Sequence, residues 1–371
     1  KKVSHFQSTQ ITEITVPSTV NKIGKYAFLE CSNLTTVKMV DVANSHLKKI
    51  GKGAFIDCKN LKEFEVPKSV YYFGRDSFKN CSHLKLKINV SSKYSIYVGK
   101  FAFYNSGIIS FEAECSSFSA NGSSFKDCKN LKKFEIKNCK KSLYINFGPS
   151  LFMNCTSLTE VKMPEILDFR IGENCFSNTS IIEFNFPNVV RKVPRNCFKN
   201  CKNLTHVSFT DDSEVDIFED EAFYESGIKS IVFPPKTQKI GESCFENCKR
   251  LKEVTLSKST TEILDKAFAS TSIEEIDFQS LNLRFGLACF KDCTKLKKVT
   301  FSDETKVRLI PESLFESCAI ETIKLISNNL KIDQFAFKNC KQLSSLTLRN
   351  AEIFKNAFEG CDKLKNIHYQ D

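Results

Sequence analysis

Tryptophan is absent from this chain of 371 residues, whereas phenylalanine occurs 34 times. Such reliance on one aromatic residue suggests a core position of fixed size that is used repeatedly. Long apolar segments are also missing: no run approaches the roughly 20 residues of a membrane-spanning helix. Residues 1–10, KKVSHFQSTQ, lack the apolar core of a signal peptide. The sequence therefore predicts no membrane insertion in this segment.

Arginine is scarce as well, with 8 residues against 46 lysines, and the net charge is +11. Bidentate recognition of phosphates and bases is characteristic of arginine, whereas lysine acts as a point charge. This composition favours weak attraction to acidic partners. We predict no nucleic-acid partner, because the recurring phenylalanines are expected in the core and cannot stack on bases.

Motifs of catalysis and cofactor binding are missing. The sequence has no nucleophile elbow, glycine-rich phosphate loop or H-E-x-x-H helix. Its five histidines fall at unrelated positions of the repeat described below. We therefore predict a noncatalytic protein with no cofactor and no catalytic or metal-binding residues.

A phenylalanine recurs 16 times, at spacings of 21 to 27 residues. A fixed period of this length is typical of a solenoid, in which each unit buries its apolar side chains against its neighbours. We therefore expect stacked phenylalanines to form a continuous core. The recurring residues are Phe6, Phe28, Phe55, Phe78, Phe103, Phe125, Phe152, Phe176, Phe198, Phe223, Phe245, Phe268, Phe290, Phe315, Phe337 and Phe358.

Positions in each unit are numbered here from this phenylalanine as zero. Position −4 is glycine in eight units, but Pro194 and Pro311 take the same place. Proline cannot adopt a positive φ, yet it is favoured at the first position of a helix. The pattern therefore predicts a short helical turn from position −4 to about +3.

Cysteine fills two small positions, −1 in four units and +3 in eleven. Pairs such as Cys244/Cys248 would permit metal ligation or a disulfide, but Ala, Ser or Thr take the same places in other units. We interpret these cysteines as buried free thiols, and the odd total of 17 excludes complete pairing within one chain. Cys115 and Cys139 lie outside both positions, so we expect them to be exposed or bridged.

A second pattern, L-x-x-V-x-L, follows each helical turn, as at Leu251, Val254 and Leu256. Its period of two predicts a strand with one buried face. Strands separated by such crossovers pair in parallel. We predict an α/β repeat solenoid, namely a right-handed superhelix of about 16 repeats with a parallel β-sheet on one face and short helical turns on the other. We expect one domain over residues 1–371, excised from within a longer repeat array.

The form V-P-x-S-V-x-x-I-G-x-x-A-F-x-x-C, clearest in residues 16–31 and 66–81, resembles the BspA-like leucine-rich-repeat family. The resemblance spans nearly the whole chain. It implies a cell-surface or secreted protein of a mucosal bacterium or protist that adheres to host cells or matrix proteins. It also implies a protein ligand. The alternative is an intracellular protein-interaction scaffold with reduced buried thiols.

The polar residues between the buried strand positions should point outward, on the surface with which solenoids usually bind partners. They carry about four more acidic than basic side chains, although the whole chain is basic. This contrast suggests a basic partner, whereas a solvated face without a ligand is the alternative. The candidate partner-binding residues are Glu63, Glu65, Glu135, Glu160, Glu183, Glu253, Glu275 and Asp277.

An acidic segment, DDSEVDIFEDE at residues 211–221, offers a second candidate site. Carboxylates in this density could hold calcium, but the spacing does not match an EF-hand loop. A solvated loop is the alternative that we favour.

Overall fold

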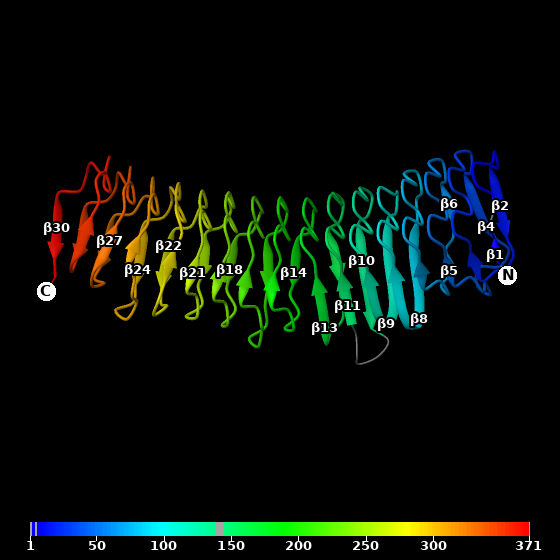
Figure 1. Ribbon diagram of the computed structural model, residues 1–371, viewed down its shortest axis with the longest axis horizontal. Coiled ribbons are helices and arrows are strands. Elements are labelled where there is room, and N and C mark those ends of the chain that lie inside the picture. Colours follow the sequence, from blue (N-terminus) through cyan, green and yellow to red (C-terminus); the bar gives the residue numbers. More distant parts are fainter. Residues whose placement is uncertain (1, 4–5, 139–143, 371) are drawn as a thin grey trace. The chain divides into compact units, whose positions relative to one another are not determined.

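The computed structural model describes residues 2–3, 6–138 and 144–370. The chain divides into two compact units, Lys1–Ile182 and Glu183–Asp371. Each unit is a stack of coils (Figure 1). A coil is one turn of the chain around the core, and its strands pair in parallel with those of the next coil. The predicted parallel β-solenoid is therefore confirmed, whereas its right-handedness and a single domain over residues 1–371 stay predictions.

The first unit contains two ladders of parallel strands rather than one. The first ladder, made of the L-x-x-V-x-L segments, comprises β2 (Glu13–Val16), β4 (Thr36–Met39), β6 (Glu63–Phe64), β10 (Lys133–Asn138), β12 (Glu160–Lys162) and the first halves of β8 (Lys87–Val98) and β9 (Ser110–Ala120). The second ladder comprises β1 (Lys2–Val3), β3 (Lys22–Ile23), β5 (Lys49–Ile50), β7 (Tyr72–Phe73), β11 (Tyr144–Phe147), β13 (Asp168–Ile171) and the second halves of β8 and β9.

The second unit repeats this arrangement. Its first ladder comprises β14 (Glu183–Asn185), β16 (His206–Ser208), β18 (Ser230–Val232), β20 (Glu253–Thr255), β22 (Glu275–Phe278), β24 (Lys298–Phe301), β26 (Thr322–Leu325), β28 (Ser345–Leu348) and β30 (Asn366–Tyr369). Its second ladder comprises β15 (Lys192–Val193), β17 (Ile217–Phe218), β19 (Lys239–Ile240), β21 (Glu262–Ile263), β23 (Arg284–Phe285), β25 (Leu309–Ile310), β27 (Leu330–Ile332) and β29 (Ala351–Ile353).

Alternation of buried and exposed side chains explains why the segments of the first ladder form strands. In β22 the side chains of Ile276 and Phe278 are buried, whereas Glu275 and Asp277 between them are exposed. The parallel register places Phe278 beside Phe301 of β24, so buried residues stack on buried residues. The strands predicted from L-x-x-V-x-L are therefore confirmed.

The predicted helical turns are wrong, because the described residues form no helix between the two ladders. Positions −2 and +2 instead adopt positive φ, as at Ser243 (52°) and Asn247 (61°), which a right-handed helix cannot contain. The N–H groups at −2, 0 and +2 donate to the next coil: Phe245 N donates to Ala267 O at 2.7 Å. Since the donors are used between coils, no intrahelical ladder forms.

No helix in the described part of the chain could cross a membrane.

Close approach of the backbone explains the glycines at position −4. A Cβ atom at Gly74 would lie 2.5 Å from Lys52 N and 2.6 Å from Gly51 C, in the preceding coil. At Gly99 it would lie 2.4 Å from Arg75 N. Such contacts are too short for any side chain, so glycine is needed here because coils meet backbone to backbone and not because a helix begins.

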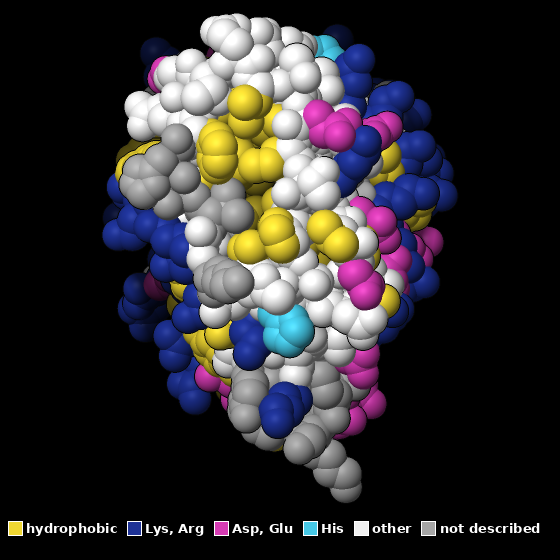
Figure 2. All heavy atoms as spheres, turned by 90° about the vertical axis from the view of Figure 1, so that its right-hand side faces the viewer, with side chains coloured by type: hydrophobic (Ala, Val, Ile, Leu, Met, Phe, Trp, Pro, Cys, Tyr) yellow, Lys and Arg dark blue, Asp and Glu magenta, His cyan; other side chains and the backbone are white. Residues whose placement is uncertain are grey.

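The core of each unit is a column of parallel phenylalanine rings. Phe245 is fully buried and stacks on Phe223 and Phe268, with ring centroids 5.0 and 5.3 Å apart. The same stacking runs from Phe6 to Phe176 in the first unit and from Phe198 to Phe358 in the second. Figure 2 looks onto the N-terminal end of the first unit, where hydrophobic side chains lie in the centre and charged side chains around the margin. Most charged side chains lie on the outer faces of the coils, with the buried Asp76 as an exception.

A register shift interrupts β8, between Ser92 and Ser95. In the residues described, β6 also ends its sheet here, because β8 pairs with β7 and β9 but not with β6.

Candidate functional site

The eight candidate acids lie where the strand period predicts, on or beside the first ladder with their side chains outside the core. Glu63 and Glu65 are exposed at β6, and Glu183 is exposed on β14. Glu135 and Glu160 are half-buried on β10 and β12. Glu253, Glu275 and Asp277 are exposed on the neighbouring coils of β20 and β22. The last three lie on neighbouring coils, as do Glu135 and Glu160 on the paired strands β10 and β12.

Lysines form ion pairs with several of the acidic residues on the first ladder of the first unit. Lys133 Nζ lies 2.7 Å from Glu135, and Lys162 Nζ lies 2.6 Å from Glu160. Lys137 donates a 3.1 Å hydrogen bond to Glu112, which lowers the pKa of that carboxyl below its usual value. Because these carboxylates already have cations beside them, they attract a further basic group only weakly.

A cavity of about 390 Å³ opens on the outer surface of the first ladder of the second unit. The outer surface of the first ladder is called the strand face below. The cavity lies where β20 and β22, although they are neighbours, belong to separate sheets. Its lining residues are Val254, Thr255, Leu256, Glu275, Ile276, Asp277, Gln279, Lys298 and Thr300.

The carboxylates of Glu275 and Asp277 line this cavity together with partly buried strand residues. Asp277 accepts hydrogen bonds from Thr300 Oγ1 at 2.6 Å and from Gln279 Nε2 at 2.8 Å, which fix its carboxylate. Lys298 lies 3.8 Å from Glu275, with both side chains largely exposed, so this ion pair is weak. Glu253, on the strand β20 that borders the cavity, has no ion-pair partner within the described ranges. The arrangement can bind a cation of a partner through oriented oxygen atoms.

The cysteines have a structural role that sequence reasoning captured only in part. At position +3, the thiol donates a hydrogen bond to the carbonyl of the phenylalanine one coil earlier, as from Cys81 to Phe55 O at 3.1 Å and from Cys248 to Phe223 O at 3.0 Å. Ten cysteines with free thiols repeat this contact: Cys31, Cys58, Cys81, Cys128, Cys155, Cys248, Cys293, Cys318, Cys340 and Cys361. Where a hydroxyl takes position +3 its contact differs: Thr179 Oγ1 donates to Phe176 O of its own coil at 2.8 Å, and Ser226 Oγ lies 3.4 Å from Cys248 Sγ.

Burial raises the pKa of several of the cysteine thiols. The pKa of Cys58 rises to about 12 and that of Cys248 to about 11, while Cys81 and Cys244 are also raised. Cys115 is fully buried on β9, so the expectation that it is exposed is wrong; Cys139 lies outside the described residues. No group of three or more His, Cys, Asp or Glu side chains that could hold a metal occurs in the ranges the structure describes.

The acidic segment at residues 211–221 is engaged by cations from neighbouring coils. Lys236 lies 2.6 Å from Glu214, Lys192 lies 2.7 Å from Glu219, and Lys199 also pairs with Glu221. Its carboxylates therefore diverge toward separate partners instead of converging on one ion.

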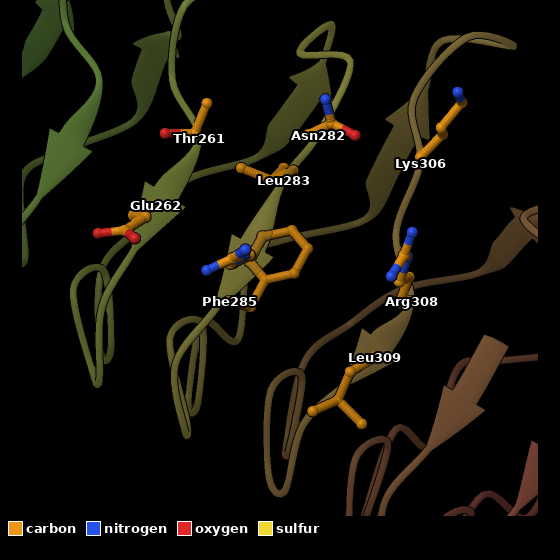
Figure 3. Close-up of a pocket in the computed structure, with 9 residues that line it drawn as sticks. Thr261, Glu262, Asn282, Leu283, Phe285, Lys306, Arg308 and Leu309 are labelled. Carbon is orange, nitrogen blue, oxygen red and sulfur yellow. The ribbon is translucent and has the colours of Figure 1, made fainter.

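Two further cavities lie on the second ladder. The sequence predicted neither this ladder nor its cavities. The cavity in the second unit has a volume of about 690 Å³ and opens between β23 and β25 (Figure 3). These strands belong to different sheets, and Pro311, which follows β25, has no N–H to donate to the preceding coil. Phe285 and Leu309 supply apolar lining, and Arg284, Lys306 and Arg308 supply positive charge. Basic residues at −7 and −6 in several units were the available sequence signal.

The family model for the BspA type leucine rich repeat region matches this chain in six overlapping copies: residues 2–132, 48–169, 121–226, 169–297, 216–344 and 280–371. The chain belongs to this family. Among solved structures, a leucine-rich repeat protein from Bacteroides ovatus is similar to this BspA-type chain over 96% of its length and 86% of the other chain, with 21% identity and a TM-score of 0.58. This likeness shows the leucine-rich-repeat fold.

Weaker likenesses to this BspA-type chain include a leucine rich cell surface protein from Faecalibacterium prausnitzii, at 18% identity with a TM-score of 0.32. It covers 98% of this chain and 80% of that one. The pneumococcal vaccine antigen PcpA is 15% identical with a TM-score of 0.43, covering 100% and 84%. No curated protein matches the chain.

Proposed function

We propose that this BspA-type chain is a noncatalytic protein-binding domain, and that it binds a basic segment of its partner through the strand face of the second unit. The cavity beside β22 carries the proposal, because Glu275 and Asp277 line it and Glu253 borders it. On β22, which carries Glu275 and Asp277, the buried Phe278 packs against Phe290 of the phenylalanine column. A partner lysine or arginine would therefore meet oxygen atoms already in position, which lowers the entropic cost of binding.

The same surface suits adhesion. Membership of the BspA-type family supports a place at the cell surface or in secretion, with host cells or matrix proteins as partners. The strand face presents acids on an otherwise basic chain, so a basic partner is steered toward it and repelled elsewhere. The remaining candidate acids, including Glu63, Glu65 and Glu183, extend this face along each unit.

Charge reversal at the cavity tests the proposal. The variant Glu253→Lys, Glu275→Lys, Asp277→Lys should fold, because exposed charge changes usually shift the free energy of unfolding by no more than about 0.5 kcal/mol each. Binding to intact epithelial cells and to immobilised basement-membrane matrix should fall at least about ten-fold, mainly through a slower association rate. Surface plasmon resonance at two salt concentrations measures both quantities, and the salt dependence should weaken in the variant.

A matched control reverses three exposed lysines of the same coils, Lys249, Lys252 and Lys295, to glutamate. It changes the same number of charges outside the cavity and should bind as the parent does. If the control loses binding while the cavity variant keeps it, the partner binds the lysine-bearing turns and the assignment is wrong.

The buried free thiols favour one alternative, an intracellular interaction scaffold. Reduced cysteines are the rule in the cytosol, whereas oxidising compartments favour disulfides. For a surface protein we expect antibodies to label intact source cells. Burial alone would then protect the thiols from oxidation. Labelling only after permeabilisation would support the intracellular alternative and contradict the adhesin.

A further inference from the structure

The second ladder of the first unit carries a cavity of about 570 Å³ that the strand-face proposal does not use. It spans β3, β5 and the start of β7. Its lining residues are Thr19, Asn21, Lys22, His46, Lys48, Lys49 and Tyr71. Three lysines and no carboxylate line it, so it is a local positive site.

These lysines are available to a ligand. Lys48 and Lys49 are exposed and Lys22 is half-buried, and none of the three has an ion-pair partner in the part of the chain that the structure describes. The parallel register sets Lys22 beside Lys49, and Lys49 beside Tyr72. Neighbouring strands are about 4.8 Å apart. The cations therefore follow the direction in which the coils stack, as a linear ligand would.

Tyrosines extend the row of lysines on the neighbouring coil. Lys49 Nζ lies 5.7 Å from the ring centre of Tyr71 and 5.9 Å from that of Tyr72. Tyr72 stacks on Tyr97 at 5.1 Å with an interplanar angle of 14°. Lysine and a second ring therefore contact Tyr72, whereas Lys49 lies over one face of Tyr71 and leaves its hydroxyl group for a ligand.

We propose that this cavity binds an anionic polysaccharide, through lysine contacts to its sulfate or carboxylate groups and through hydroxyl and amide contacts from Thr19, Asn21 and Tyr71 to its sugars. The charge of the cavity is complementary to such a chain, and its polar lining suits sugar hydroxyls. This site is separate from the strand face and does not depend on the protein partner proposed above.

Two other polyanions fit less well. A single-stranded nucleic acid needs several open aromatic faces on which successive bases stack, and Tyr71 is the only aromatic residue other than His46 in the lining of this cavity. An acidic peptide needs an apolar pocket for an anchoring side chain, and the lining contains no exposed aliphatic residue. The larger cavity of the second unit differs in this respect, because Leu283, Phe285 and Leu309 line it and Glu262 adds a negative charge.

Heparin is the probe for sulfate groups and hyaluronan the probe for carboxylates alone. The whole chain should bind immobilised heparin with an affinity that falls as salt increases. The variant Lys22→Glu, Lys48→Glu, Lys49→Glu should bind at least about ten-fold more weakly and show a shallower salt dependence. Hyaluronan binding that is lost in the same variant would assign carboxylate recognition, whereas binding to heparin alone would assign sulfate.

The control replaces Lys59, Lys62 and Lys68, which are exposed in the same coils but line no part of the cavity, by glutamate. It carries the same net charge as the cavity variant and should bind heparin as the parent does, with unchanged thermal unfolding in both variants. Equal losses in the two variants would show that overall charge, and not the cavity, attracts the ligand. Equal affinity for oligo(dT) or for poly-glutamate, lost in the cavity variant, would also overturn the proposal.

Discussion

Replacing Phe245 by alanine should lower the free energy of unfolding by about 3–5 kcal/mol. The ring is fully buried, stacks between Phe223 and Phe268, and meets Phe233 edge to face at 5.7 Å. The β-strands on either side are held by backbone hydrogen bonds between coils, so the surroundings cannot collapse into the space. A cavity therefore remains, and the lost ring contacts add to the lost burial.

Urea unfolding followed by circular dichroism measures this effect. Since each coil contacts mainly its neighbours, the variant should also unfold in two steps where the parent unfolds in one. Phe354→Ala is the control, because this side chain is 42% exposed and its loss should cost much less. Similar urea midpoints for Phe245→Ala and the parent would mean that the phenylalanine column does not hold the coils together.

Raising the pH above about 9 should destabilise the protein steeply. The pKa values of Cys58, Cys81, Cys244 and Cys248 are raised in the folded state, first by burial, whereas an unfolded cysteine ionises near pH 8.5. Between the unfolded and folded pKa values the unfolded chain binds fewer protons, so stability falls as pH rises. Each thiol contributes up to about 1.4 kcal/mol per pH unit, and four contribute roughly 5 kcal/mol per unit.

Urea midpoints measured from pH 7 to 10 test this expectation, in a range below the ionisation of most lysines. The variant Cys81→Ser, Cys248→Ser should fold, because Ser106 and Ser226 fill the same +3 position in other coils. Its stability should fall less steeply with pH, by up to about 2.7 kcal/mol per pH unit for the two thiols removed, since serine does not ionise. An equally steep fall in parent and variant would show that groups other than these thiols cause the alkaline loss.

The first ladder could be predicted from sequence because its strands are long enough to show a period. In β22 and β26, two buried residues alternate with two exposed ones. The second ladder could not, because strands such as β3 and β19 contain two residues, of which one points inward. No period can be read from one buried residue. The basic cavities on this ladder were missed for the same reason.

The turns were misread because their left-handed positions carry few glycines. Positive φ occurs at Tyr26, Phe101 and Lys266 as well as at Gly53, so composition gives a weak signal. Position +2 is the exception, because asparagine and aspartate, which tolerate this conformation, recur directly before the cysteine. Asn80, Asn105, Asn154, Asn178, Asn200, Asn247 and Asn339 all have positive φ there.

The candidate acids were placed correctly on the strand face, but their surroundings could not be deduced. Which lysine reaches Glu112 depends on side-chain directions in two adjoining strands, β9 and β10. The cavity at Glu275 depends on a break in pairing between β20 and β22, which the repeat pattern does not show. Sequence periodicity therefore predicts which residues are exposed, whereas local irregularities decide where a ligand fits.

The two-ladder coil also limits how the molecule can change by gain or loss of repeats. One coil contributes one strand to each ladder, as β20 and β21 do for neighbouring ladders of the second unit. Duplication of a coil would therefore lengthen the acidic strand face and the second ladder by the same step. An array could in this way grow in avidity for two partners together, while the balance between its two surfaces would change only by substitution.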